Sequence, residues 1–188
     1  MKTRTCVWTA CLAFSAAFSA LHGSEHRSGV VRLSDGQDHE GEIWFTNGQL
    51  RVYESAEGKS GRYVNVTQDE LTGVAFTFKE RSMERPWRFK EAGSDEKEYL
   101  PGTYPLVNLV AEVTLASGKA LTGHLINAPV YVRVPDLANP MDHQTLKFHM
   151  KYQYQGEVGQ KYEDLVFVEE IRFSDGKAAA APGADGSL

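Results

Sequence analysis

The sequence predicts an all-β protein built from two related small β-domains, and three observations carry this prediction. Short segments in which apolar and polar residues alternate run through most of the chain, as in half-buried strands. Turn signals rich in glycine and asparagine separate these segments. A pattern of leucine, two spaced glycines and a second apolar residue occurs twice, 82 positions apart: Leu33, Gly36, Gly41 and Ile43 recur as Leu115, Gly118, Gly123 and Leu125.

The amino terminus reads as a secretory signal peptide covering residues 1–22. Lys2 and Arg4 precede an uncharged and mostly apolar stretch, residues 6–21, that ends in small residues. A membrane-spanning helix needs about 20 apolar residues, and this run gives way to polar and charged residues from His22 onward. We therefore expect a secreted or periplasmic product with no stable membrane span after the signal is cleaved.

Cleavage would change the chemistry of the chain. Both cysteines, Cys6 and Cys11, lie in the signal peptide, so the mature protein would have no disulfide, no thiolate nucleophile and no cysteine-bound zinc. An exported chain without cysteine favours a bacterial envelope protein. Loss of Lys2 and Arg4 makes the formal charge, −5 for the whole chain, two units more negative. Nucleic acid is therefore not an expected partner.

The first repeat, residues 28–79, is expected to contain five short strands. These cover residues 29–34, 39–45, 49–54, 62–67 and 73–79, with turns at Asp35-Gly36 and Asn47-Gly48 and one helical turn over residues 68–71. The arrangement resembles the SH3-like and Sm-like small barrels. That resemblance implies a barrel that buries one alternating face and closes on itself.

The second repeat, residues 107–174, follows the same plan with about 15 additional residues. Strands are expected over residues 113–115, 121–127 and 130–134, followed by a long loop, Pro135 to Gln144. Residues 145–154 then show the clearest alternation in the chain, and the segment ending at Phe173 mirrors the segment ending at Phe76. The predicted fold is thus two tandem SH3-like or Sm-like barrels after an N-terminal signal peptide, and it resembles uncharacterised exported bacterial proteins built from such repeats.

Two further segments complete the predicted domain organisation. Residues 80–106 mix both charge signs and form a charged linker, in which the alternation from Trp87 to Lys90 could add a strand to one barrel. Residues 175–188 have too little apolar bulk to pack and are expected to be a disordered tail.

Motifs for catalysis, metals and cofactors are incomplete. His39-Glu40 begins like a zinc-protease helix, but Ile43 stands where the second histidine ligand is needed. Gly58-Lys59-Ser60 looks like the end of a phosphate-binding loop, but Tyr53 replaces its first glycine. We therefore expect no catalytic residues, no metal site and no cofactor, although acidic residues near Asp35 and Asp38 leave a calcium site open as an alternative.

The best candidate binding residues lie on the outer face of the first repeat. If Ile43, Phe45 and the other alternating apolar residues through Val64 and Val66 point inward, then four side chains must point outward: Trp44, Arg51, Tyr53 and Tyr63. Exposed aromatic patches often mark contact surfaces. The alternative is that Trp87 and Phe89 of the linker, or the second repeat, cover this patch.

These observations predict a non-enzymatic binding or scaffold protein of the bacterial envelope, with a protein, peptide or glycan as its partner. One alternative is a secreted hydrolase with a distributed site near Asp142 and His143, possible only if His149 also lies close by. A second alternative is a purely structural module of an envelope assembly.

Overall fold

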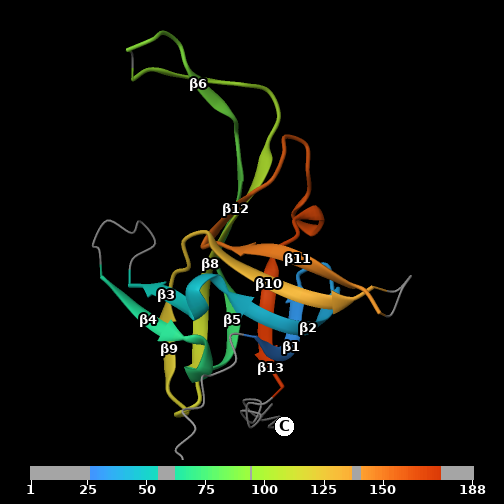
Figure 1. The fold of residues 1–188 in the computed structure, drawn as a ribbon. Helices are drawn as coiled ribbons and strands as arrows, with labels where there is room; N and C mark the ends of the chain where they lie inside the picture. Colours follow the sequence, from blue (N-terminus) through green and yellow to red (C-terminus); the bar gives the residue numbers. More distant parts are fainter. Residues whose placement is uncertain (1–25, 55–61, 94, 137–140, 175–188) are drawn as a thin grey trace, which may run out of the picture.

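The structure is a computed structural model that describes residues 26–54, 62–93, 95–136 and 141–174. The predicted signal peptide and the predicted tail lie outside these residues. The regular secondary structure of these residues consists of strands and three short 3₁₀ turns, so the predicted all-β class is confirmed (Figure 1).

The strands follow one another closely along the chain. They are β1 (Arg27–Leu33), β2 (Asp38–Phe45), β3 (Gln49–Tyr53), β4 (Tyr63–Thr67), β5 (Leu71–Glu84), β6 (Trp87–Phe89), β7 (Lys97–Tyr99), β8 (Tyr104–Leu115), β9 (Ala120–Gly123), β10 (Ala128–Pro135), β11 (His143–Met150), β12 (Gln153–Gln155) and β13 (Val168–Phe173). The 3₁₀ turns are η1 (Thr46–Gly48), η2 (Gln68–Glu70) and η3 (Tyr162–Asp164). The predicted helical turn before the last strand of the first repeat is therefore present as η2.

The repeated glycine turns have the same geometry in both halves. Gly36 and Gly118 both have left-handed backbone conformations, with φ of 85° and 80°. In each turn the leucine three residues earlier accepts a hydrogen bond from the glycine N–H, at 3.0 Å for Gly36 and 2.8 Å for Gly118. Glycine adopts such φ values without steric cost, which explains why the sequence pattern repeats it at this point.

Nine strands form one sheet in which the two halves of the chain are interleaved. The order is β11-β10-β2-β1-β13-β5-β8-β12, and β9 also pairs with β8. The last strand of the first repeat, β5, pairs with the first strand of the second, β8. Conversely, β13 pairs with β1. Two separate barrels, each closed by its own last strand, are therefore not confirmed, and no closed barrel is found among the described strands.

The pairing of β5 with β8 has a local cause. Successive strands in a chain usually pair with each other when a short turn joins them. Residues 80–106, predicted as a linker, instead continue β5 and β8 as one long hairpin, which ends in the two-stranded β6–β7 pair. We call residues 78–109 the arm, because Figure 1 shows this hairpin projecting away from the rest of the molecule. The predicted strand at Trp87 is present, but among the described strands its pairing partner is β7, and it adds no strand to the nine-stranded sheet.

The two halves match each other in register as well as in strand order. Leu33 of β1 pairs with Val168, and the register of β1 against β13 shifts directly before this pair. Leu115, 82 positions after Leu33, pairs with Leu71, and the register of β8 against β5 likewise shifts directly before Leu115, between Thr114 and Leu115. The sequence repeat therefore corresponds to an internal twofold likeness that extends to the position of a β-bulge. The symmetry relates β1 to β8, β2 to β9, β3 to β10, β4 to β11 and β5 to β13.

A single core lies on the inner face of the interleaved strands. Ile43 and Leu125, which are 82 positions apart, are both completely buried in it. Leu50, Val52 and Val66 are also buried, as their alternation predicts. Val64 shares a face with Val66 and pairs with the buried Val52, as predicted, but its side chain is 47% exposed near the start of β4.

Candidate functional site

The predicted binding residues lie on three strands and do not form one patch. Trp44 is on β2, Arg51 and Tyr53 are on β3, and Tyr63 is on β4. Strand β2 pairs with β1 and β10, whereas β3 pairs with β4 and makes one bridge to the chain after β9. The structure thus brings Arg51, Tyr53 and Tyr63 together and places Trp44 on a different ladder of strands.

Arg51, Tyr53 and Tyr63 form a contiguous surface, which we call the tyrosine surface. Tyr53 and Tyr63 are cross-strand partners, with ring centroids 5.4 Å apart and ring planes inclined by 50°. The Arg51 guanidinium lies 5.2 Å from the centroid of the Tyr63 ring. Tyr63 is 44% exposed. Two tilted phenol rings and an arginine can provide apolar contact, hydroxyl groups and a positive charge to a bound partner.

Trp44 is instead enclosed between aromatic rings. The His26 ring stacks on one side at 4.3 Å, and the Tyr131 ring stacks on the other at 5.5 Å, both within 11° of parallel. The Lys147 ammonium group lies 5.6 Å from the Tyr131 ring centroid. We call these four residues, His26, Trp44, Tyr131 and Lys147, the tryptophan row. Because neighbouring side chains cover the faces of the indole, little of its π surface remains for a ligand.

Of the two segments that the sequence suggested as cover for Trp44, only the second repeat covers it. Tyr131 belongs to the second repeat, which was one of the two predicted sources of cover. Trp87 and Phe89 were the other source, and they lie in the arm, where they contact each other at 5.1 Å. His26 and Tyr131 were not singled out from the sequence. The alternation of Tyr131 with the apolar residues Val130 and Val132 was the available signal.

The hairpins β3–β4 and β10–β11 occupy corresponding places in the two halves. Glu42 of β2 pairs with Arg133 of β10. His124, 82 positions after Glu42, forms the equivalent bridge with Tyr53. Tyr53 therefore corresponds to Arg133 and, through its cross-strand partner, Tyr63 corresponds to Thr145. The same framework thus presents two tyrosines in one half and an arginine and a threonine in the other.

The residues proposed for a distributed hydrolase site are not brought together. His143 and His149 lie near opposite ends of β11, and six residues along a strand span about 20 Å. His143 is exposed and lines a shallow hollow with Glu40, Glu42 and Arg133. In that hollow Glu42 accepts a hydrogen bond from the Arg133 guanidinium at 3.0 Å. The geometry therefore gives His149 no role beside Asp142 and His143.

The charged hairpin considered for calcium has its own pairing. The Asp38 carboxylate accepts two hydrogen bonds from the Arg32 guanidinium, both of 2.8 Å. This contact lowers the pKa of Asp38 below its usual value, mainly through the hydrogen bonds from Arg32. Among the described residues, no group of three or more histidine, cysteine, aspartate or glutamate side chains is placed to hold a metal ion.

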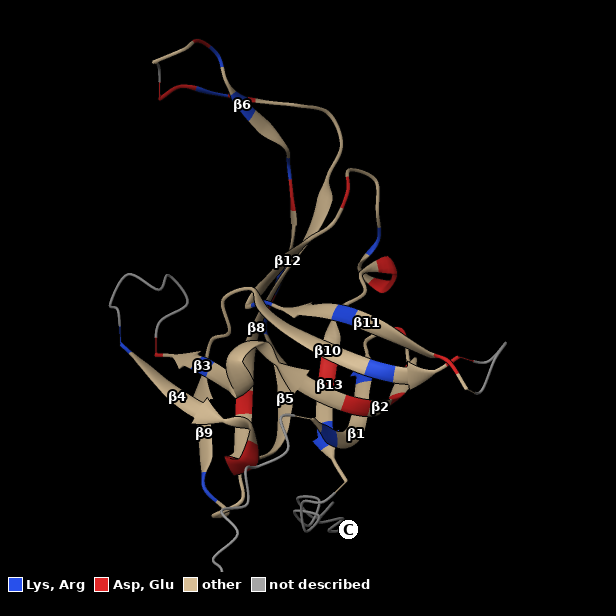
Figure 2. Cartoon of the chain, in the orientation of Figure 1, with Lys and Arg blue, Asp and Glu red and all other residues tan. Residues whose placement is uncertain are grey.

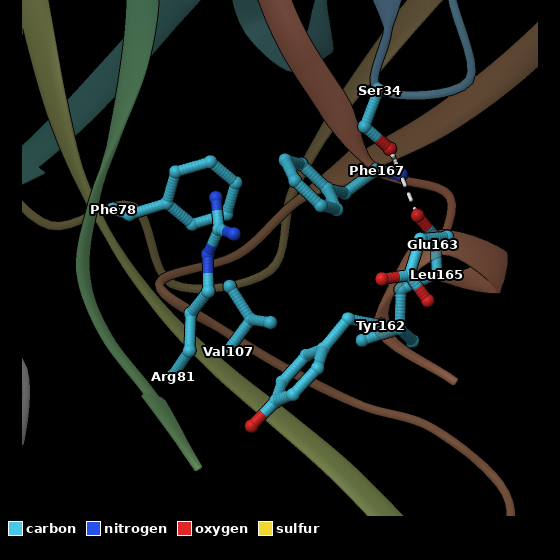
Figure 3. Close-up of a pocket in the computed structure, with 8 residues that line it drawn as sticks. All are labelled: Ser34, Phe78, Arg81, Val107, Tyr162, Glu163, Leu165 and Phe167. Carbon is cyan, nitrogen blue, oxygen red and sulfur yellow. Dashed lines mark hydrogen bonds between the residues drawn. The ribbon is translucent and has the colours of Figure 1, made fainter. Parts of the chain in front are cut away.

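A small hollow lies at the base of the arm (Figure 3). Arg81 extends across the Phe78 ring, and Tyr162 stands opposite. Its volume is about 170 Å³, below the range of roughly 300–1,000 Å³ typical of small-molecule sites. The Ser34 hydroxyl donates a hydrogen bond to the Leu165 carbonyl and accepts one from the Phe167 N–H, so it holds two segments together. We interpret this hollow as a packing feature of the arm base.

A larger hollow beside β11 is lined by Phe148, Phe167, Tyr154 and two lysines, Lys147 and Lys151. Its buried hydroxyl group is already bonded, because the Tyr154 hydroxyl donates to the His149 carbonyl at 2.5 Å. Burial raises the pKa of Tyr154 to about 12. The phenol is therefore protonated at neutral pH and serves to fix the turn between β11 and β12.

Comparisons with protein-family models, with curated proteins and with solved structures found no match for this chain. Within the described ranges, no helix is long and apolar enough to cross a membrane.

Proposed function

We propose that the chain is a non-enzymatic binding or scaffold protein, exported to the bacterial envelope, that contacts its partner through the tyrosine surface. The observation that carries this proposal is the grouping of exposed Arg51 and Tyr63 with half-buried Tyr53 on a regular pair of strands. Rigid strands hold contact residues more accurately than loops do.

The tyrosine surface is a better contact site than Trp44 for a physical reason. Tyrosine and arginine are enriched where proteins bind one another, because they combine a large contact area with hydrogen-bonding groups. Within the described part of the chain, Tyr63 has one aromatic neighbour, Tyr53, whereas Trp44 has stacked rings on both sides. The chemistry suits a protein or peptide segment, or a glycan, that offers an apolar face together with hydrogen-bond acceptors.

The ancestry and location of the protein form part of the same proposal. We infer that the two halves arose by duplication of one unit similar to an SH3-like or Sm-like barrel, whose last strands were exchanged when the linker became a hairpin. The matching glycine turns and the matching register shifts support this. Export to the periplasm or the cell exterior is supported by the predicted signal peptide alone.

The experiment compares two double variants at corresponding positions of the two halves. Arg51→Gln with Tyr63→Ala alters the tyrosine surface, and Arg133→Gln with Thr145→Ala alters its counterpart. Each protein is used in crosslinking and capture from envelope extract. We expect the amount of partner captured by the first variant to fall at least about tenfold, since interface tyrosines and arginines often contribute more than about 1 kcal/mol each to binding.

The control variant should retain capture within about twofold, because its residues lie outside the tyrosine surface. Equal retention by both variants would count against the tyrosine surface as the contact site. Failure of the unaltered protein to retain any partner at high concentration would count against a binding function altogether.

A further inference from the structure

The arm carries an aromatic face that begins at its base. The register of β5 against β8 shifts between Phe78 and Glu80, so one residue is left over at Lys79. This β-bulge places Phe78 and Arg81 on the same face, although they are three residues apart. The Arg81 guanidinium consequently lies 3.4 Å from the Phe78 ring centroid.

The same parity along the chain leads from Arg81 to Trp87 and Phe89, with Arg85 and Pro86 lying between strands β5 and β6. Trp87 and Phe89 are two residues apart on β6 and contact each other at 5.1 Å, and Tyr99 pairs with Trp87 across the ribbon. We call this face the aromatic stripe. Its residues are Phe78, Arg81, Met83, Arg85, Trp87, Phe89, Lys97 and Tyr99.

The three cations of the aromatic stripe lie on rings rather than on carboxylates. Besides Arg81, the Arg85 guanidinium is 5.4 Å from the Tyr99 ring centroid, and the Lys97 ammonium is 3.9 Å from the Trp87 ring. No ion pair joins any of the three to a carboxylate within the described part of the chain. The stripe is therefore both apolar and positively charged.

The acidic residues of the arm strands lie on the opposite face. Arg88 forms an ion pair with Glu98 at 2.8 Å, and Lys90 pairs with Glu96 at 2.5 Å. Glu80 accepts a hydrogen bond from Asn108, a residue of that same face. Figure 2 shows both charge signs along the arm. The positive and negative charges of the arm cancel when they are counted along the sequence. Alternation across the ribbon nevertheless places the ion pairs on one face and the three cations of the aromatic stripe on the other.

The outer part of the aromatic stripe, on β6 and β7, is exposed and unsupported. Trp87 is 42% exposed, Phe89 51% and Tyr99 56%. At this point the ribbon has two strands and no third among the described residues, and an isolated two-stranded ribbon is only marginally stable in water. A surface that covers these rings would therefore also stabilise the arm.

We propose that the aromatic stripe docks on an anionic lipid surface. Aromatic rings with lysine or arginine beside them suit the interface between headgroups and acyl chains, where the rings lie at the boundary and the cations meet anionic headgroups. The opposite face, with its charges paired, remains in water. Because the arm projects from the body, its end can reach a flat surface before the body does (Figure 1).

The exposed area favours a lipid surface over an acidic protein. An aromatic side chain presents about 150–250 Å², so the three half-exposed rings of β6 and β7 offer on the order of 300 Å² of aromatic surface. A stable protein interface needs about 800 Å² from each partner. A lipid surface has no such requirement, since each ring that enters it adds its own contribution. The inference is independent of the tyrosine surface.

Binding to vesicles tests the proposal with two matched double variants. The protein used is residues 23–188, which contains every described element and omits the apolar segment that would bind lipid by itself. Arg85→Gln with Lys97→Gln removes two cations from the aromatic stripe, and Arg88→Gln with Lys90→Gln removes two from the opposite face. Vesicles contain phosphatidylcholine alone, or with about one third phosphatidylglycerol.

We expect binding of the unaltered protein to the anionic vesicles, weakened by salt. The stripe variant should bind on the order of 20-fold more weakly, and the opposite-face variant should change by less than about threefold. In a Trp44→Phe background, the fluorescence of Trp87 should shift to shorter wavelength on binding. Circular dichroism and the melting temperature check that each variant keeps its fold.

Three results would overturn the proposal. One is no binding to anionic vesicles, and another is an equal loss in both double variants, which would indicate an effect of net charge alone. The third is binding to polyglutamate without binding to vesicles, which would indicate an acidic polypeptide as the partner.

Discussion

The two hairpins β3–β4 and β10–β11 occupy corresponding places in the fold but are attached to it differently. Strand β10 pairs with β2 over four residues, Val130 to Arg133. We call this pairing between the two halves the firm seam, and the tryptophan row crosses it. Among the described residues, strand β3 meets the other half at a single bridge, between Tyr53 and His124, which we call the weak seam. The hairpin with the firm seam has its aromatic rings covered, whereas the hairpin with the weak seam presents the tyrosine surface.

This difference shows how one backbone plan can supply both structure and recognition. Aromatic residues on a long seam stack across strands and stabilise the sheet. Aromatic residues beside a single bridge have fewer cross-strand neighbours and keep part of their surface exposed. Aromatic residues on equivalent strands therefore either stabilise the sheet or remain partly exposed. The number of residue pairs in the neighbouring strand pairing decides between these two outcomes.

The largest expected effect concerns the two glycines at the seams. A Cβ atom at Gly41 would lie 2.0 Å from the Arg133 carbonyl oxygen, and one at Gly123 would lie 2.6 Å from the Tyr53 carbonyl oxygen. Gly41→Ala must push apart a four-residue ladder, so we expect it to lower the free energy of unfolding by about 3 kcal/mol. Gly123→Ala displaces a hairpin held by one bridge and should cost about 1–2 kcal/mol. Urea denaturation of both variants measures the difference.

The turn glycines provide the control for that comparison. Gly36 and Gly118 have positive φ values, and a Cβ atom at either would meet nothing within 4 Å. Each substitution by alanine should therefore cost a similar amount, about 1–2 kcal/mol from backbone strain. If Gly123→Ala were as costly as Gly41→Ala, the two seams would be equally firm, and the contrast between the hairpins would be lost.

The strand pattern of each half was predictable, whereas its pairing was not. Alternation indicates which residues of a segment face inward, and turn residues such as Gly36 indicate where a strand ends. Together they predicted strands β1 to β4 and the turn η2 close to their observed positions. The same alternation is satisfied whether β5 pairs with β1 or with β8, since both partners bury the same face. The exchange of last strands depends on residues 80–106 forming a hairpin, and their mixed charges indicated a linker.

The candidate site was predictable to a similar extent. Parity along the strands correctly placed Arg51, Tyr53 and Tyr63 together, because β3 and β4 are neighbours in sequence and form a hairpin. Trp44 was grouped with them for the same parity. Its actual neighbour Tyr131 is 87 positions away, and no local pattern reports a contact between strands of different repeats.

A smaller effect is expected from the two residues related by the 82-position offset at the outer face, Trp44 and Ile126. Trp44→Ala removes stacking against His26 and Tyr131 and should cost about 2 kcal/mol. Ile126 is 38% exposed, so Ile126→Ala should cost about 1 kcal/mol or less. Melting curves of the two variants, taken under the same conditions, give the comparison.

Combining Trp44→Ala with Tyr131→Ala measures the energy of the contact between the two rings. Because the rings of Trp44 and Tyr131 are in contact, the double variant should cost about 1 kcal/mol less than the sum of the two single variants. Additive effects would show that the contact between Trp44 and Tyr131 contributes nothing to stability beyond the two separate side chains.

The smallest effect is a pH dependence that should distinguish His124 from its counterpart Glu42. His124 is 9% exposed, and burial lowers its pKa below the ordinary value near 6.5. Between that value and the lower pKa of the folded state, the unfolded chain binds a proton that the folded chain does not. Stability should therefore fall as the pH falls below about 6.5. His124→Gln should flatten this part of the curve when the free energy of unfolding is measured from pH 7 to pH 5. A matched Glu42→Gln variant should leave the slope in that window in place, because it keeps the buried imidazole. If the slope survived in His124→Gln, the weak seam would contain no buried histidine that resists protonation, and its difference from the firm seam would lie in strand pairing alone.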